Sequence, residues 1–377
     1  FYYAWSGDDL KLALMEVGVA HIFRDTGRLY FETPYLIEVL NSDLIIDFSG
    51  DMWGDNANFV GKDRLLVGLC KDYVPMLLGK RIVMLAGSPG PFTDEGIKTF
   101  AKKVYSGFEL VTTREELSRS LLEKDGFDVK NTISCACPSF LFQAAERREV
   151  ERIQEVREIF NTDKPVVGFT ISGWNFSEGP FDKWPRHDDE YMIFARAIDF
   201  LIDSIRARVC LFSHSNGFEK TDSGFKVTNG RDYIIVKQLF EMLRESRSNE
   251  NLCILNGVYM PKQMKAIIGK FEMVVSGRLH GAVAAVSQGV PTVIIDYGHE
   301  PKAHKLRGFA RILNMEEMVV DPSNLEDMLR IISACWKNRH QIRTYLAERI
   351  PFVRELAQQN FDLLRQMVYC RKGGAGE

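Results

Sequence analysis

The chain has 377 residues, of which 45% are hydrophobic, so it is long enough for two domains that each bury a core. A formal net charge of −3 gives no overall basic footprint, which disfavours broad binding to nucleic acid. Seven scattered cysteines, several of them within apolar runs, favour reduced thiols and argue against a disulfide framework.

No apolar run approaches the roughly 20 residues that span a bilayer, and the first residues do not resemble a signal peptide. We therefore expect a cytoplasmic protein without a transmembrane segment, associated with a membrane only through a bound substrate. The sequence begins with Phe1 instead of Met, and an anchor upstream of it would place the protein in a secretory lumen.

The first half of the chain alternates predicted strands and helices. Residues 43–56 form a short apolar run followed by a loop rich in Gly and Asp, and residues 80–92 form a second strand and its loop. Helices are predicted over 94–108 and 113–127, the second with Thr113 as N-cap and Glu116 three positions later. This alternation predicts a mostly parallel sheet with helices on both faces.

The second half repeats the alternation after a turn at residues 161–165. Strands are predicted over 166–173, 208–217, 251–255, 273–275 and 292–295, and helices near 188–206, 232–245 and 282–287. The predicted fold class is α/β, with two Rossmann-like domains facing a cleft. We place these domains at 1–162 and 163–321, followed by C-terminal helices at 322–377 that pack across both.

Three residues, Arg278, Leu279 and His280, follow the strand at 273–275 and precede the next helix. Ligands of open α/β sheets bind at such corners, because a helix N-terminus offers unpaired N–H groups and a partial positive charge to an anion. Burying an arginine without a partner is costly, so this arrangement implies a charged companion. We predict that Arg278 and His280 bind and act on an anionic ligand.

Further site candidates follow the other strands, because both domains should direct these loops toward the cleft. The candidates are Ser49, Gly50, Asp51, Asp55, Gly87 and Ser88 in the first domain and Ser172, His214, Ser276, Gly281, Tyr297, His299, Glu300 and Lys302 in the second. An acidic residue after a strand often caps a turn, as Asp51 and Asp55 would, and His214 could equally make a structural hydrogen bond. Ser88, within a run of Gly and Pro, could belong to a rigid turn.

The run Ser276-Gly277-Arg278-Leu279-His280, followed by Gly289-Val290-Pro291, Tyr297 and Lys302, resembles the signature of the polysaccharide pyruvyl transferase family. Weaker matches cover most of the chain, at 50–56, 79–92, 112–127 and 208–215. The sequence differs from the family pattern at Cys137, where Asp is common, and it lacks a clear Gly-Asn-x-Gly loop near its start.

The resemblance implies a glycosyltransferase B-type fold and transfer of pyruvate from phosphoenolpyruvate to a sugar or polysaccharide, in cell-wall or exopolysaccharide biosynthesis. The first domain would then be the acceptor side and the second the donor side. Arg278 would hold the anionic groups of the donor, and the backbone N–H of Leu279 its phosphate. His280 would transfer a proton, because its ordinary pKa lies near neutrality.

The roles of other groups stay open at this point. Lys302 would add positive charge, and a carboxylate such as Asp51 or Glu300 could protonate the methylene carbon. No carboxylate cluster or Cys–His set suits a cation, so neither a metal nor a dissociable organic cofactor is expected. The expected partners are phosphoenolpyruvate and a sugar, lipid-linked or polymeric saccharide acceptor, and the chain could form an oligomer.

Two alternative functions also stay open. A nucleotide-sugar-dependent glycosyltransferase of the same fold would hold a diphosphate at the corner formed by Arg278 and His280. Glu300 is the only obvious carboxylate that could pair the ribose of such a donor. A catalytically inactive relative would instead keep the cleft for binding a sugar or polymer.

Overall fold

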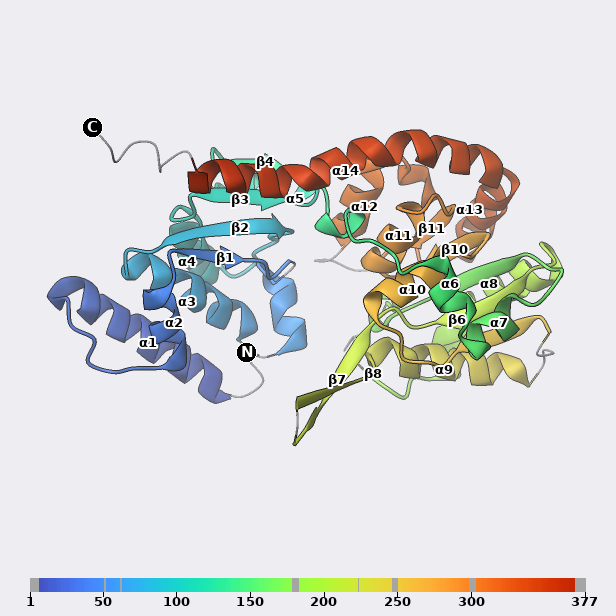
Figure 1. Cartoon of the computed structure of the whole chain (residues 1–377), viewed down its shortest axis with the longest axis horizontal. Helices are drawn as coiled ribbons and strands as arrows, with labels where there is room; N and C mark the ends of the chain where they lie inside the picture. The colour runs from blue at the N-terminus through green and yellow to red at the C-terminus, as the bar shows by residue number, and fades with distance from the viewer. Residues whose placement is uncertain are drawn as a thin grey trace. The chain divides into compact units, whose positions relative to one another are not determined.

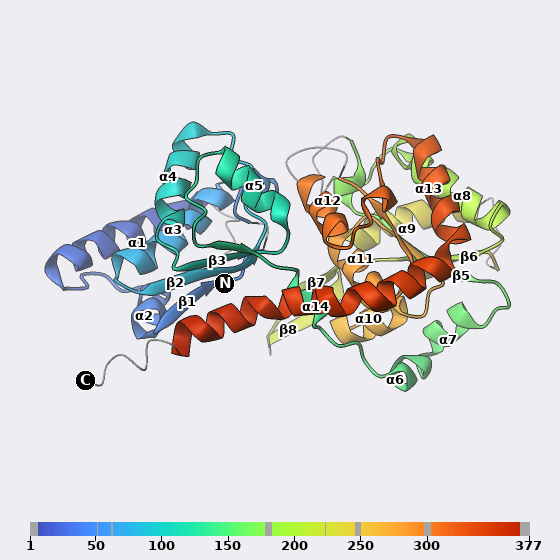
Figure 2. The ribbon, with the colours of Figure 1, turned by 90° about the horizontal axis from the view of Figure 1, so that it is seen from above.

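The computed structural model describes residues 7–50, 52–61, 63–177, 183–222, 224–245, 250–297 and 303–369. The chain folds into two compact units, unit 1 from Phe1–Pro138 with Leu356–Glu377 and unit 2 from Ser139–Glu355. Each unit has its own parallel sheet flanked by helices, which confirms the predicted α/β class (Figures 1 and 2). Residue 162, where the sequence places the domain boundary, lies in unit 2.

Unit 1 contains a four-stranded parallel sheet in the order β1-β2-β3-β4. Its strands are β1 (Leu44–Asp47), β2 (Arg81–Gly87), β3 (Leu110–Thr113) and β4 (Thr132–Ser134). Its helices are α1 (Gly7–Thr26), α2 (Pro34–Asn41), the short η1 (Asp55–Val60), α3 (Arg64–Leu77), α4 (Glu95–Tyr105), α5 (Glu116–Lys124) and η2 (Pro138–Phe140), which begins at the boundary with unit 2.

Strand β2 is buried on both faces, because its apolar residues alternate between two hydrophobic clusters. Ile82 and Met84 pack with residues of α1 to α4. Val83 and Leu85 pack against apolar residues near the end of the long helix α14 (Arg339–Tyr369). This burial on two faces explains why residues 81–87 read as an almost unbroken apolar run.

Helix α5 begins at Glu116, two residues later than a helix with Thr113 as its N-cap would begin. Thr113 is the last residue of β3, and the N-cap is Glu115, whose carboxylate accepts the backbone N–H of Ser118 at 2.8 Å. The predicted N-cap at Thr113 is therefore wrong, because the strand pairing of Thr113 with Ser134 continues the extended backbone up to that point.

Unit 2 contains a six-stranded parallel sheet in the order β12-β11-β10-β5-β6-β9. Its strands are β5 (Val166–Thr170), β6 (Arg208–Phe212), β9 (Leu252–Leu255), β10 (Met273–Ser276), β11 (Thr292–Ile295) and β12 (Val319–Val320). Between β6 and β9 the chain adds an antiparallel hairpin of β7 (Asn216–Thr221) and β8 (Gly224–Asn229). The sequence did not predict this hairpin.

The helices of unit 2 are α6 (Arg147–Glu151), α7 (Gln154–Phe160), α8 (Met192–Asp203), α9 (Arg231–Arg244), α10 (Pro261–Ile268), α11 (Leu279–Val286), α12 (Ala303–Ile312) and α13 (Leu325–Lys337), with short turns η3 (Gly173–Asn175), η4 (Asp188–Tyr191) and η5 (Glu316–Met318). Apolar residues of α7, α10 and α11 form one core cluster with β5, β6 and β10. Helices α8 and α13 contact each other and pack against β6 and β11.

Residues 325–337 and 339–369 form the helices α13 and α14. The part of α14 up to Glu355 belongs to unit 2, and the part from Leu356 belongs to unit 1. Across the described ranges, every helix is too short or too polar to cross a membrane.

Candidate functional site

The candidate site of unit 2 lies where the carboxyl ends of β5 and β10 meet. From β5 the sheet is extended on one side by β6 and β9, and from β10 on the other side by β11 and β12. The connections therefore change direction between β5 and β10, which is the topological switch point where open α/β sheets bind ligands. The predicted residues Ser172, His214 and Arg278 follow β5, β6 and β10 at this edge.

The turn from β10 into α11 is shaped by Ser276, which is fully buried. Its hydroxyl donates to the carbonyl of Arg278 at 2.9 Å and accepts the N–H of Arg278 at 3.3 Å. A Cβ on Gly281 would lie 2.7 Å from the same hydroxyl. Ser276 and Gly281, both predicted as substrate-binding residues, thus hold the backbone of the turn in this structure.

Helix α11 begins at Leu279, three residues earlier than predicted, with Arg278 as its N-cap residue. The side chain of Arg278 makes no capping hydrogen bond to this helix end. Leu279 is buried, whereas His280 is exposed and Arg278 is half-buried. The first N–H groups of a helix have no partner within the helix, so this end of α11 can donate to an anion.

Asn175 joins three loops at the site. Its side-chain oxygen accepts the N–H of Ser172 at 2.9 Å, and its amide donates to the carbonyls of Ile295 and Asp296 at 3.3 and 3.1 Å. A Cβ on Gly277 would lie 2.1 Å from the same oxygen, so only glycine fits there. Asn175 is 1% exposed, and the Asn-Phe-Ser sequon therefore cannot be glycosylated in the folded chain.

Arg278 has an internal charged companion, Asp232 in the first turn of α9. Its Nε donates to Asp232 Oδ2 at 2.7 Å and its Nη2 to Oδ1 at 2.5 Å, which is a bidentate pair. The Asp232 side chain is 1% exposed and that of Arg278 is 27% exposed. The carboxylate therefore fixes the plane of a guanidinium that still reaches the surface.

His280 lies close enough to His214 to affect the charge of His214. Burial, reinforced by the nearby His280 and Arg278, lowers the pKa of His214 to about 3, although Asp232 opposes the shift. The ring carbon Cδ2 of His214 is the third nearest atom to a Cβ built on Gly281, at 3.7 Å. His214 is therefore neutral at physiological pH and packs against the first turn of α11.

Helix α12 brings further positive charge to the same edge. Arg307 Nε donates to Asp296 Oδ2 at 2.9 Å, directly after β11. His304 and Lys305, in the first turn of α12, are both buried. Tyr297 is buried with its ring 6.3 Å from that of Trp174. The predicted residues Lys302, His299 and Glu300 lie outside the described residues.

In unit 1 the predicted residue Ser88 belongs to a buried polar cluster. Arg114 Nε donates to the Ser88 hydroxyl at 2.6 Å, and the Ser88 N–H donates to the Gly50 carbonyl at 2.8 Å. Burial raises the pKa of the neighbouring Glu115 carboxyl, although hydrogen bonds from Ser118 and the nearby Arg114 oppose the shift. Asp51, which the sequence placed beside them, lies outside the described residues.

Unit 1 also contains a pair of buried acidic residues, Asp47 and Asp72, that the sequence analysis missed. Burial raises the pKa of Asp72 well above its ordinary value, and the charge of Asp47 at the end of β1 raises it further. Burial also raises the pKa of Asp47. Trp53 Nε1 donates to Asp72 Oδ2 at 2.7 Å, which fixes one oxygen of the pair. Proximity in space, not spacing in sequence, brings these two carboxyls together.

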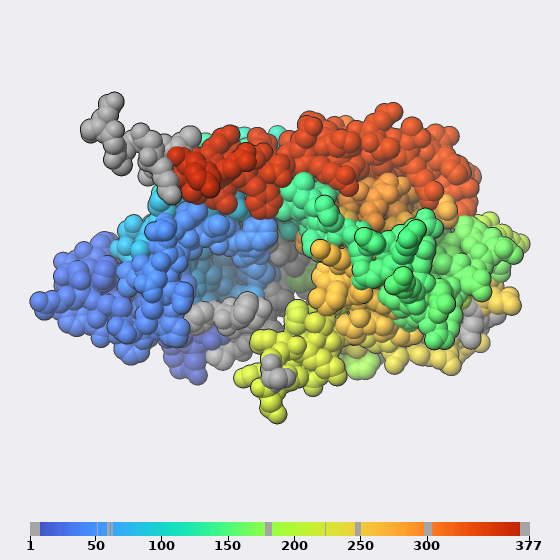
Figure 3. All heavy atoms as spheres, in the orientation of Figure 1, coloured from blue at the N-terminus to red at the C-terminus, as the bar shows by residue number. Residues whose placement is uncertain are grey.

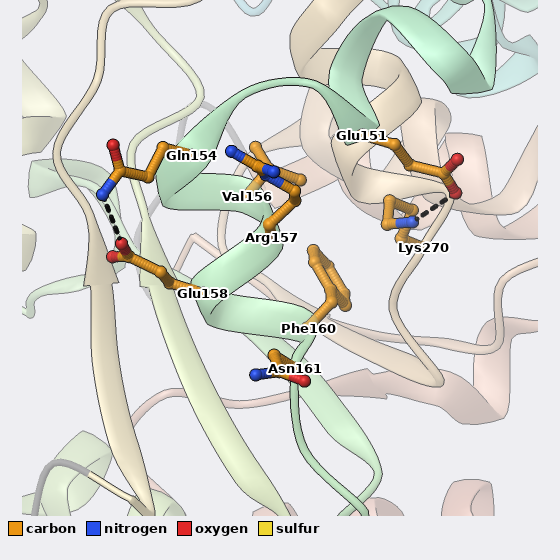
Figure 4. Close-up of a pocket in the computed structure, with 8 residues that line it drawn as sticks. All are labelled: Glu151, Gln154, Val156, Arg157, Glu158, Phe160, Asn161 and Lys270. Carbon is orange, nitrogen blue, oxygen red and sulfur yellow. Dashed lines mark hydrogen bonds and ion pairs between the residues drawn. The ribbon is translucent and has the colours of Figure 1, made fainter.

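A surface hollow in unit 2 lies away from this chemistry. Figure 4 shows Glu151, Gln154, Glu158 and Lys270 around it, beside α6 and α7. Lys270 Nζ lies 3.0 Å from Glu151 Oε1, and Gln154 Nε2 donates to Glu158 at 2.8 Å. These residues precede β5 and β10 in the chain, so the hollow lies at the amino edge of the sheet, opposite Arg278.

The structure thus brings together seven of the predicted residues of unit 2, namely Ser172, His214, Ser276, Arg278, Leu279, His280 and Gly281. It adds Asp232 and Asn175, which the sequence analysis missed. Asp232 reads locally as an acidic residue in a first helical turn, and Asn175 as a sequon. Among the described residues there is no group of three or more His, Cys, Asp or Glu side chains that could hold a metal ion.

Most of the chain matches a protein-family model. The family model described as polysaccharide pyruvyl transferase matches residues 3–299. A sequence relative is the amylovoran biosynthesis protein AmsJ of Erwinia amylovora, 23% identical over 355 residues, which are 93% of this chain and 79% of the relative.

Solved structures with a similar fold share little sequence with this chain. HepE from Anabaena, in complex with UDP-glucose, superposes with a TM-score of 0.55 at 12% identity over 97% of this chain and 98% of its own. The α,α-trehalose 6-phosphate synthase of Burkholderia multivorans has a TM-score of 0.55 at 12% identity, covering 97% and 81%. UDP-GlcNAc 2-epimerase of Neisseria meningitidis has a TM-score of 0.54 at 10% identity, covering 97% and 84%. These likenesses support the glycosyltransferase B-type fold.

Proposed function

This chain belongs to the polysaccharide pyruvyl transferase family, and from that premise we propose that it moves pyruvate from phosphoenolpyruvate to two hydroxyls of a saccharide, forming a ketal. The observation that carries the proposal is the Arg278-Leu279-His280 run at the entrance of α11, on the switch-point edge of the sheet. The name of the Erwinia amylovora relative supports a role in making an exopolysaccharide.

The site suits a compact donor that carries both a phosphate and a carboxylate. Arg278 presents a planar guanidinium whose orientation is set by Asp232, so little rotamer freedom is lost when it meets an oxyanion. The first N–H groups of α11 supply donors to a phosphate. Arg307 in α12 adds positive charge at the same edge, although Asp296 offsets part of it.

The two histidines divide the proton chemistry. His214, neutral because of its lowered pKa, lacks the second ring proton of an imidazolium at neutral pH and so cannot act as a cationic acid. His280 is exposed at the helix entrance and is the group assigned to proton transfer. In the reaction one acceptor hydroxyl proton ends on the methylene carbon, making it a methyl group, and the other leaves with the phosphate. Both hydroxyl oxygens end bonded to the former enol carbon.

Donor choice tests the proposal against a nucleotide-sugar-dependent glycosyltransferase. The protein is incubated with phosphoenolpyruvate or with UDP-glucose and a panel of galactosides and mannosaminides, and inorganic phosphate and UDP are measured. We expect the protein to release phosphate from phosphoenolpyruvate. Arg278→Lys should lower the rate of this release, because the point charge of lysine lacks the bidentate fork of arginine. The matched control is Arg311→Ala on α12, which removes an exposed ion pair between Arg311 and Glu316. This variant should retain full activity. Release of UDP alone would favour the glycosyltransferase.

A further inference from the structure

The hairpin β7–β8 is inserted between two residues of the candidate site. Strand β7 begins two residues after His214, and β8 ends three residues before Asp232. Figure 1 shows the hairpin leaving the body of unit 2, and in the space-filling view it stands out from the surface (Figure 3). Because four fully extended residues span at most about 14 Å, Phe218 lies within that distance of His214.

The base of the hairpin is fixed to the body of unit 2. The Gly230 N–H donates to the Ser215 carbonyl at 3.1 Å, and a Cβ on Gly230 would lie 2.5 Å from that oxygen. Asn216 Nδ2 donates to the Tyr259 carbonyl at 2.9 Å, and Asn229 Nδ2 to the Asn256 carbonyl at 3.3 Å. The base therefore holds the outer part of the hairpin at a defined position relative to His214.

One face of the hairpin is aromatic and exposed. Phe218 pairs with Val227 and Lys220 with Phe225, and side chains of paired residues share a face. Phe218 is 72% exposed and Phe225 is 70% exposed. They are diagonal neighbours, about 7–8 Å apart at Cα, so the two exposed rings lie on the same face of the hairpin. We call the residues Phe218, Lys220, Phe225 and Val227 the aromatic face.

The surroundings of the aromatic face favour a neutral, amphipathic occupant. The described charged residues of the hairpin are Glu219, Lys220, Asp222 and Lys226, and their charges cancel. A membrane surface would call for an excess of basic residues. A second copy pairing along a strand edge is opposed by the charged side chains there. A saccharide matches, because the C–H face of a sugar ring packs on an aromatic ring while its hydroxyls meet polar side chains.

We propose that the aromatic face binds sugar units of the acceptor saccharide beyond the unit that receives pyruvate. This inference rests on the proposed function for the identity of the acceptor, but the binding itself requires no donor. The covalent continuity of the hairpin with His214 and Asp232 makes the face an extension of the site. The protein should consequently prefer a polymeric acceptor over a single sugar.

The test compares three paired variants in the full chain. Phe218→Ser with Phe225→Ser removes both rings, Phe218→Tyr with Phe225→Tyr keeps them, and Glu219→Ser with Lys226→Ser changes a cross-strand pair on the opposite face. Mobility is measured in native gels that contain soluble galactan, mannan or β-glucan, without donor. A thermal melt confirms that each variant is folded, as expected for substitutions of exposed side chains.

At least one polysaccharide should retard the wild type, and the serine pair should weaken that apparent affinity by about tenfold to a hundredfold. The apparent affinities of the tyrosine pair and the opposite-face pair should stay within about twofold of the wild-type affinity, because neither change removes an aromatic ring. With phosphoenolpyruvate, the serine pair should raise KM for the polymer and leave kcat and the KM for a methyl glycoside unchanged.

The outcomes separate this inference from the proposed function. If the serine pair loses retardation but phosphoenolpyruvate releases no phosphate with any acceptor, the proposed function is wrong and the binding face stands. If phosphate release occurs and the serine pair behaves as the wild type, the binding face is wrong. No retardation of the wild type by any of the three polysaccharides would also overturn it. Binding to anionic vesicles and the mass in sedimentation are measured for the same variants. If the serine pair changes only vesicle binding or only the sedimentation mass, the aromatic face serves a membrane or a second copy of the chain, and the inference is wrong.

Discussion

The ion pair between Arg278 and Asp232 predicts an asymmetric response to mutation. Arg278→Ala leaves a carboxylate whose side chain is 1% exposed, whereas Asp232→Asn leaves a guanidinium that is 27% exposed and can meet water. An uncompensated buried charge costs about 3–5 kcal/mol. Asparagine retains a hydrogen-bond acceptor for Arg278, so its cost should be about 1–2 kcal/mol.

The measurement is a calorimetric melt of each variant, with the transition of unit 2 fitted separately because the chain has two units. For a unit of this size 1 kcal/mol shifts the melting temperature by about 2–4 °C. We therefore expect Arg278→Ala to lower it by about 10 °C and Asp232→Asn by about 4 °C. The double variant should be more stable than Arg278→Ala alone, because the second change removes the stranded charge.

Equal losses from the two single variants, or a double variant less stable than Arg278→Ala, would refute this reasoning. The different stabilities of the two single variants also affect how their activities are compared. Loss of turnover in Arg278→Ala reports on donor binding only if the variant is folded at the assay temperature. The double variant offers a comparison in which the arginine is absent and no buried carboxylate is left behind.

Three further changes have defined outcomes. His280→Ala should lower kcat by about 10²- to 10⁴-fold with a smaller effect on donor affinity, while the exposed His340→Ala on α14 should retain full turnover; a folded His280→Ala with near-full turnover would make this histidine structural. Because the pKa of His214 is lowered to about 3, the unfolded chain binds a proton that the folded chain does not as pH falls below about 6.5. The free energy of unfolding should therefore fall as the pH drops from about 6.5 toward 3. In urea titrations at pH 7 and pH 4, His214→Asn should make this fall smaller. An unchanged difference between the two pH values would contradict a lowered pKa of His214. The raised pKa of Asp72 acts with the opposite sign, since its folded form holds a proton that the unfolded chain has released, so stability is lost as pH rises. Asp72→Asn should therefore stabilise the protein more at pH 7 than at pH 4 in the same titrations, and equal effects at both pH values would count against a raised pKa.

The parallel strands could be predicted from the sequence because their burial is local and continuous. Met273, Val274 and Val275 are all fully buried in β10, and an apolar β-branched run is what burial on two faces requires. The site corner followed from the same signal, since Arg278 and His280 interrupt an apolar region at a strand end. The start of α11 was placed three residues late, because Arg278 and Leu279 do not read as a helix cap.

The remaining features depend on contacts between residues far apart in the chain. Asp232 lies 46 residues before Arg278, and no local pattern indicates that they pair. Asn175 bonds to the carbonyl of Asp296, 121 residues later. The hairpin was missed because a ribbon exposed on both faces lacks the alternation that identifies a half-buried strand.

The most direct test of the account follows the methylene group of the donor in deuterated water. The protein is incubated with phosphoenolpyruvate and a saccharide acceptor, and the ketal methyl group is observed by proton and carbon NMR together with phosphate release. We predict that one phosphate is released for each ketal formed, that each new methyl group contains one deuterium, and that His280→Ala gives almost no product. Phosphate release without a ketal, or transfer that occurs only from UDP-glucose, would contradict it.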